Sequence, residues 1–191
     1  MRQGDVVAEI GIGSGPNLQY YGARAKRVVA VEPNLAFEEF VTAEADASRT
    51  TLELVQGYAE ALPLPDASVD VLVGTMVLCT VNDVTRSLVE ARRVLKPGGK
   101  YLFTEHTKAP EDWTLLNVAQ ATSDPLQRVF GKGCHLRRDP LPAIRDVFGD
   151  ANVRSRSFVL SNTNRGPPWP PHFLLAPHLV GAATKPAGPG A

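Results

Sequence analysis

A glycine-rich turn between two apolar runs is the feature that most constrains how this chain can fold. Residues 6–10 form a largely apolar run that ends in the Gly-x-Gly-x-Gly turn of residues 11–15, and a second apolar run, residues 28–31, ends on Glu32. This pattern is typical of a buried strand that enters a tight turn, followed by its parallel neighbour. Glycine lets backbone amides approach a ligand closely, and a carboxylate such as Glu32 can accept hydrogen bonds from both hydroxyls of a ribose. The segment therefore predicts a site for a nucleotide-type cofactor.

The spacing of the glycines argues against a dinucleotide. A dinucleotide-binding turn has its third glycine five positions after the first, and here that position is Pro16. An acidic residue, Glu9, stands two positions ahead of Gly11. The segment resembles motif I of the class I S-adenosylmethionine (SAM) methyltransferases, in which the methionine part of SAM lies over the glycine turn. From this segment alone, a glycine-rich turn of another α/β protein stays the alternative.

Length and composition indicate one domain. The chain has 191 residues, is 43% hydrophobic and carries 20 basic and 20 acidic residues, so its formal net charge is zero. We expect a single domain over residues 1–185 and a disordered tail over residues 186–191. Neutral charge argues against a nucleic-acid partner. The two cysteines, Cys79 and Cys134, are too few for a disulfide framework or a cysteine-rich metal site.

The apolar runs along the chain alternate between strand and helix, as a parallel sheet requires. Strands are expected at residues 6–10, 28–32, 52–55, 69–73, 101–104, 153–160 and 179–183, and helices at 18–25, 34–47, 83–95, 113–130 and 142–148. Pro125 should break or kink the helix over residues 113–130, and residues 163–171 read as a loop. The expected fold is α/β: a Rossmann-like, doubly wound, mostly parallel seven-stranded sheet.

Two further segments strengthen the methyltransferase resemblance. Residues 57–70 resemble the family stretch that runs from the adenine-contacting loop to the fourth strand, and residues 95–100, Leu-Lys-Pro-Gly-Gly-Lys, resemble the turn before the fifth strand. Both occur in the family's order. The resemblance spans residues 5 to about 185.

Landmarks in the second half narrow the resemblance to the membrane-associated alkyl-thiol methyltransferases of the methyltransferase-like group. They are Val77-Leu78-Cys79-Thr80-Val81, Thr104-Glu105-His106, Trp113, Asp124-Pro125, residues 133–138 (Gly-Cys-His-Leu-Arg-Arg) and residues 177–181. This similarity implies S-methylation of a small thiol. A thiolate is a strong nucleophile with a reference pKa near ~8.5, so such an enzyme needs mainly to align the sulfur with the SAM methyl group and exclude water.

The resemblance also implies roles for individual residues toward SAM. Gly11, Gly13 and Gly15 would pass close to its methionine part, Glu9 would orient the turn or reach the ligand amine through water, and Glu32 would bind the ribose. The remaining expected contacts are Pro33, Tyr58, Ala59, Thr75 and Leu78.

The adenine loop departs from the family pattern. Many relatives have an acidic residue after the glycine of this loop, which accepts a hydrogen bond from the adenine amino group, and here that residue is Tyr58. The backbone of Ala59 could contact the ring edge, while Tyr58 stacks on the ring or points away from it.

His106 is the tentative catalytic residue, as a base that assists thiol deprotonation. It follows a strand, and the carboxyl ends of strands in such sheets face the ligand cleft. A structural histidine bonded to backbone is an equally weighted alternative. Cys79 is expected to be a buried core thiol, and Cys134 and His135 belong either to a substrate lid or to the packed surface. Because Cys134, His135, His172 and His178 are scattered, no metal site is expected.

Members of the family carry a helix ahead of the first strand that covers the cofactor, and the thiol methyltransferase group adds an apolar membrane anchor. Neither precedes the first strand here, so we expect the covering helix to be absent and the SAM cleft to be more open. No transmembrane segment is expected, since no run approaches ~20 apolar residues. The expected location is cytoplasmic, or the endoplasmic reticulum or lipid-droplet surface if an anchor is missing.

Three function hypotheses follow. The first is methylation of a small thiol by SAM. The second keeps SAM but methylates oxygen, nitrogen or carbon of another small molecule, as in quinone-type enzymes. The third is a non-catalytic protein with the SAM-binding fold, motivated by Tyr58 and by the missing covering helix. The sequence leaves the acceptor and the oligomeric state open.

Overall fold

The structure is a computed structural model, and it describes residues 1–160 and 172–188, with the side chains of 23, 172 and 173 left out. The loop expected at residues 163–171 therefore lies outside the described residues, as do the last three residues of the expected tail. Seven strands of the described part form one sheet in the order β3-β2-β1-β4-β5-β7-β6. They are β1 (Asp5–Ile10), β2 (Ala25–Glu32), β3 (Leu52–Gln56), β4 (Val69–Thr75), β5 (Leu95–His106), β6 (Val153–Val159) and β7 (Pro177–Thr184). The predicted doubly wound, mostly parallel fold is confirmed.

The sheet is parallel except at one edge. β1 pairs in parallel with both β2 and β4, while β7 runs antiparallel between β5 and β6. The parallel strands therefore end along one edge of the sheet, and the order reverses between β1 and β4. Ligands of open α/β sheets bind outside the carboxyl ends of the strands at such a switch point.

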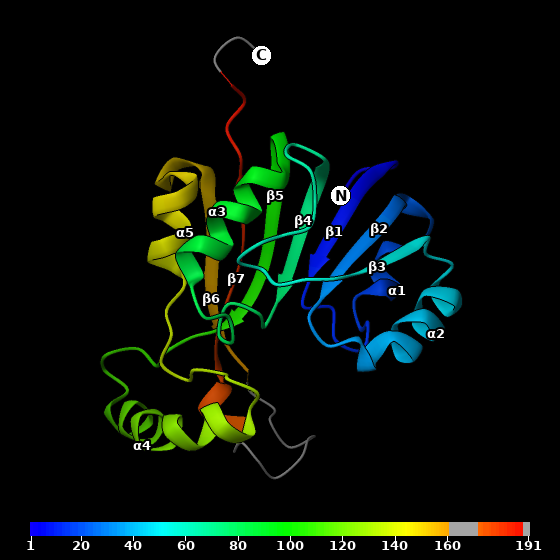
Figure 1. Cartoon of the computed structure of the whole chain (residues 1–191). Coiled ribbons are helices and arrows are strands. Elements are labelled where there is room, and N and C mark those ends of the chain that lie inside the picture. The colour runs from blue at the N-terminus through cyan, green and yellow to red at the C-terminus, as the bar shows by residue number, and fades with distance from the viewer. Residues whose placement is uncertain (161–171, 189–191) are drawn as a thin grey trace.

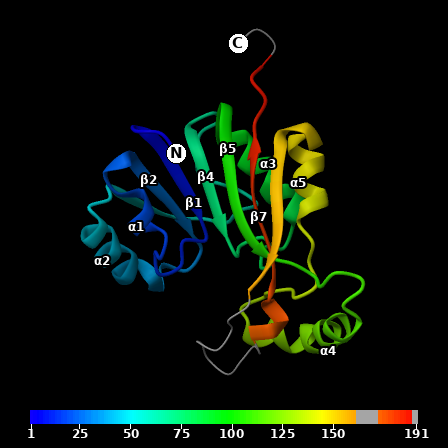
Figure 2. The same cartoon turned by 180° about the vertical axis from the view of Figure 1, so that it is seen from behind.

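Helices cover both faces of the sheet (Figures 1 and 2). α1 (Leu18–Tyr21) and α2 (Glu38–Ser48) lie on one face, and α3 (Val84–Val94) and α5 (Leu141–Phe148) lie on the other. A further helix, α4 (Thr114–Phe130), covers neither face. Alternate residues of the strands serve the two faces, as the two-residue period of a strand requires. Val7 of β1 packs with α1 and α2, whereas its neighbour Ala8 packs with α3 and α5.

Local signals fix several helix starts. The Asp83 side chain accepts a hydrogen bond from the Arg86 amide at 2.9 Å and so caps the N-terminus of α3. Asn34 accepts from the Ala36 amide and caps a 3-10 turn, Leu35–Phe37, that leads into α2. The expected helix over residues 18–25 is shorter, because Gly22 leaves the helical region with φ of +47° and a 3-10 turn, Gly22–Arg24, leads into β2.

Helix α4 lies beyond the carboxyl edge of the sheet (Figure 1) and does not break at Pro125, so that part of the prediction is wrong. Polar side chains on its buried face hold it in place. Gln120 accepts from the Ala109 amide and donates to the Leu174 carbonyl, and Asp124 accepts from the Leu136 amide. These tertiary bonds, made by two residues that precede the proline, offset the single helical N–H that it lacks. No helix of the described residues is long and apolar enough to cross a membrane.

Candidate functional site

A cavity of about 360 Å³ lies where β1, β2 and β4 end. Its wall combines five separate segments of the chain. They are Gly11, residues 31–33 at the end of β2, residues 57–60 after β3, residues 76, 77 and 80–82 after β4, and Gly131 and Lys132 after α4. The topology alone brings these segments together, since each follows the carboxyl end of a strand or the helix that lies beyond that edge.

Of the three glycines in the turn after β1, Gly11 lines the cavity, and Gly13 and Gly15 do not. All three glycines have positive φ, between +55° and +84°, which other residues adopt only with strain. A Cβ at Gly11 would lie 2.7 Å from Cγ2 of Val77, whereas a Cβ at Gly13 would meet no protein atom within 4 Å. A Cβ at Gly15 would lie 2.9 Å from Leu18, so this glycine is needed for helix packing. The turn thus leaves open space over Gly13 for a ligand that lies against the backbone.

Glu9 lies under the turn and contacts protein rather than the cavity. It is 2% exposed, and its two oxygens accept hydrogen bonds from Asn17 and Tyr21, each at 2.7 Å. Asn17 also donates to the Thr75 hydroxyl at 3.0 Å, which joins the turn to the end of β4. Burial raises the pKa of Glu9, and the bonds from Tyr21 and Asn17 oppose that rise. Glu9 and Thr75 therefore fix the turn to its neighbouring strand.

Glu32 is the charged group at the end of β2. Its side chain lines the cavity, is 6% exposed, and accepts the Gly13 amide at 3.0 Å on Oε2 and the Asn34 amide at 3.1 Å on Oε1. Each carboxylate oxygen has a second lone pair. The carboxylate is thus held by backbone and keeps acceptor capacity, which fits a diol ligand such as a ribose. Pro33, which follows it, also lines the cavity.

The loop after β3 forms the opposite wall. Ala59 is buried, while the Tyr58 side chain is 62% exposed at the cavity rim. Gly57 packs so closely that a Cβ would lie 2.8 Å from Pro63 and 3.0 Å from Val31. The structure thus brings Tyr58 and Ala59 to the same cavity as Glu32.

Sequence reasoning missed much of the wall after β4 and α4. Met76 and Val77 line the cavity, and Met76 has a φ of +58°. Glu105 of β5, fully buried, fixes this turn by accepting the amides of Val77 and Leu78, each at 3.0 Å. Burial raises the pKa of Glu105 to about 7. Leu78 is buried and does not line the cavity. The signal available in the sequence was the apolar run directly after the fourth strand.

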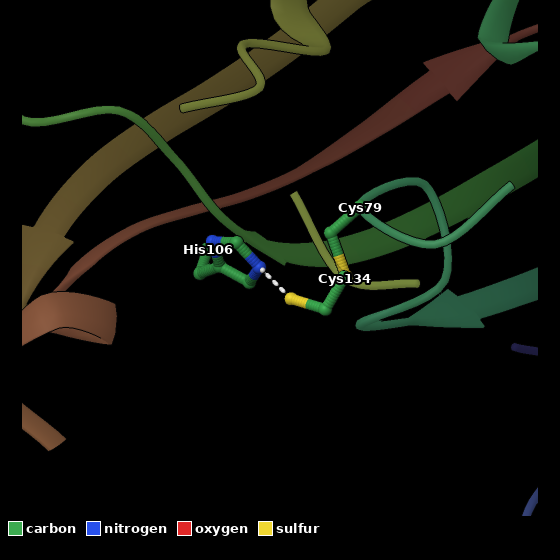
Figure 3. A group of neighbouring side chains, drawn as sticks. All are labelled: Cys79, His106 and Cys134. Carbon is green, nitrogen blue, oxygen red and sulfur yellow. Dashed lines mark hydrogen bonds between the residues drawn. The ribbon is translucent and has the colours of Figure 1, made fainter. Parts of the chain in front are cut away.

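His106 also lies away from the cavity wall. It is 1% exposed, and its Nε2 is 3.0 Å from the Cys134 sulfur (Figure 3). Cys79, at the turn after β4, is the third member of this buried group. The role of His106 as a base stays a prediction. It would need a path for the proton between the cavity and this buried ring.

Comparisons with known proteins agree with this geometry. Residues 8–103 match the model of the family described as "Methyltransferase domain". Thiol S-methyltransferase TMT1B of Rattus norvegicus is 34% identical over 185 residues, which cover 93% of this chain and 69% of that protein. The ubiquinone/menaquinone biosynthesis C-methyltransferase UbiE of Caulobacter is 42% identical over 83 residues, 44% of this chain and 32% of that protein. The crystal structure of YcgJ from Bacillus subtilis has the same fold, with a TM-score of 0.74 at 19% identity over 98% of this chain and 94% of that one.

Proposed function

The chain belongs to the class I SAM-dependent methyltransferases, close to the thiol S-methyltransferases, and from that premise we propose that it methylates a small thiol. SAM is the family's methyl donor, and it supplies an electrophilic methyl group on a sulfonium sulfur. The observation that carries the cofactor assignment is the pairing of the glycine turn with Glu32 on one cavity. The support for a thiol acceptor is the similarity to TMT1B over 93% of the chain.

The residues of the cavity divide the binding of SAM among them. In this proposal Glu32 accepts hydrogen bonds from the ribose hydroxyls, and the glycine turn leaves room for the methionine part. Ala59 and Tyr58 contact the adenine from the opposite wall, Tyr58 by stacking. Pro33 bounds the ribose, and Glu9 and Thr75 act indirectly by holding the turn.

For the methyl transfer itself, the protein needs mainly to position the reactants and to exclude water. A thiolate is already a strong nucleophile, so alignment and exclusion of water supply most of the catalysis. The wall after β4 offers Met76, Val77 and Val81, three apolar side chains suited to excluding water. An apolar small thiol suits this lining better than a charged acceptor.

The test is turnover with radiolabelled SAM and a panel of small thiols, phenols and quinols. Label on a thiol product supports the proposal, and label only on phenols or quinols contradicts it. A quinone-type activity is the second candidate, favoured by the 42% identity to UbiE over part of the chain. Calorimetry tests the non-catalytic alternative: failure of the folded protein to bind SAM would favour it over both enzymes.

A further inference from the structure

Three residues far apart in the sequence bring soft metal-ligand atoms together in the interior. Cys79 follows β4, His106 ends β5, and Cys134 lies in the loop after α4. Their two sulfurs and one ring nitrogen all lie within 4.8 Å of one another (Figure 3). Within the described residues, no other set of three histidine, cysteine or acidic side chains lies close enough together to share an ion. No local motif indicates this group, because the spacings are 27 and 28 residues rather than the short spacings of known metal-binding motifs.

We propose that Cys79, His106 and Cys134 form a binding site for one thiophilic divalent metal ion of the Zn²⁺ type. Two thiolates and one imidazole are among the donor sets that tetrahedral zinc takes, and the fourth position is left to another ligand. This inference goes beyond the proposed methyl transfer and does not depend on it.

The geometry needs only a small adjustment to hold the ion. Zn–S bonds of ~2.3 Å and Zn–N bonds of ~2.0–2.1 Å at tetrahedral angles separate ligand atoms by about 3.6–3.8 Å. The His106 Nε2 to Cys134 Sγ distance is 3.0 Å, so this pair would open by roughly 0.6 Å to admit zinc. The other two pairs lie within 4.8 Å, so each would close by at most about 1.2 Å.

The imidazole of His106 is poorly satisfied by protein alone. The residue is 1% exposed, Nδ1 has no hydrogen-bond partner, and Nε2 has only the Cys134 sulfur, a weak partner. Buried polar groups normally have stronger partners than this. A metal ion at Nε2 would replace the weak contact with sulfur by a strong bond, while Nδ1 would still have no partner in the protein.

Charge balance also favours a divalent ion in this interior. Cys79 is 4% and Cys134 8% exposed, so a cation here would lose nearly all its hydration. Binding would release the two thiol protons to solvent, and the two thiolates would neutralise the charge of the ion. The bound site would then be electrically neutral.

The ion would connect two parts of the cofactor cavity wall, the segment after β4 and the segment after α4. Cys79 lies between Val77 and Thr80, which line the cavity, and Cys134 follows the lining residues Gly131 and Lys132. The two segments already meet in one backbone bond, from the His135 amide to the Cys79 carbonyl at 2.9 Å. A metal would fix them to the end of β5 through His106.

The experiment measures metal content and the cobalt spectrum of the full chain. Reduced, metal-free protein is titrated with Co²⁺ alone and then with Zn²⁺ alone. We expect one ion per chain by elemental analysis, a thiolate-to-Co²⁺ charge-transfer band that Zn²⁺ abolishes, and protection of both cysteines from alkylation. Cys79→Ser, Cys134→Ser and His106→Gln should each weaken binding by at least ~100-fold. His135→Gln, next to the site but outside it, should bind as the wild type does.

Wild-type readouts keep the inference testable if the variants do not fold. Folded wild type that gives no charge-transfer band and no cysteine protection would overturn the site. Conversion of the two cysteines to a disulfide under mild oxidation, at equal rate with and without Zn²⁺, would assign them a redox role instead. If His106→Gln kept full metal affinity, the histidine would not be a ligand, and its predicted role as a base would regain support.

Discussion

The replacement of Glu32 by glutamine is the sharpest test of the cofactor site. The carboxylate is 6% exposed and is already held by two backbone amides, from Gly13 and Asn34. Glutamine has the same shape, but it keeps one acceptor oxygen and puts an amide nitrogen, a donor, in place of the other. One of the two ribose contacts, and the charge that strengthens both, are therefore lost.

The size of the effect follows from the kind of bond removed. A hydrogen bond to a charged group contributes about 1.5–3 kcal/mol, so the dissociation constant of SAM should rise roughly 10- to 150-fold. In the ligand-free protein, the NH₂ group of glutamine would also face one of the two backbone N–H groups, and two donors cannot bond to each other. The lost hydrogen bond should cost about 1 kcal/mol of stability. In a chain of this length, that lowers the Tm by about 2–4 °C.

Isothermal calorimetry measures the affinity, and thermal unfolding shows that the variant is folded. The matched control is Glu53→Gln on the neighbouring strand β3. Glu53 is paired with Arg27 at 3.1 Å, but both side chains are about half exposed, so we expect no change in SAM affinity. An unchanged SAM dissociation constant for folded Glu32→Gln would refute the ribose assignment.

Three further predictions use the same assays. Gly13→Ala should cost about 1 kcal/mol of stability through its positive φ and should weaken SAM binding by at least ~10-fold. The control is Gly4→Ala, which also has a positive φ and open space around its Cβ but lies away from the cavity, so it should lose stability and keep its SAM affinity. Equal SAM affinities for the two variants would contradict a ligand lying against Gly13. Tyr58→Ala should raise the SAM dissociation constant about 2- to 12-fold by loss of stacking on the adenine, and Tyr58→Phe should leave it unchanged. A wild-type dissociation constant for Tyr58→Ala would mean that the ring points away from the adenine. Hydrogen bonds from Arg93 lower the pKa of Glu90 in the folded protein. The Glu90 carboxylate therefore stabilises the fold fully at pH values above its unfolded pKa of ~4.3. This stabilisation is lost as the pH falls through the lower pKa of the folded state. In urea unfolding, Glu90→Gln should therefore be less stable than wild type by about 1 kcal/mol at pH 7 and no less stable near pH 3; a difference independent of pH would contradict the ion pair.

Much of the fold could be predicted because each element has a local signal. The strands that end at Ile10, Glu32 and Thr75 are short, valine-rich apolar runs, and their length and composition favour β-structure. The errors lie where tertiary contacts outweigh local preference. Helix α4 continues through Pro125 because Gln120 and Asp124 bind backbone groups of other segments, which no local pattern reveals.

The sequence by itself determined the sheet, the glycine turn and the position of Glu32 at a strand end, because these depend on residues close together in the chain. Tertiary structure alone decided that Glu9 faces protein, and that Met76 and Lys132 share one cavity wall. It also decided that Cys79, His106 and Cys134 meet in the interior. Contacts between distant segments depend on how the sheet edge and α4 pack, and that packing is a property of the whole fold rather than of any local pattern.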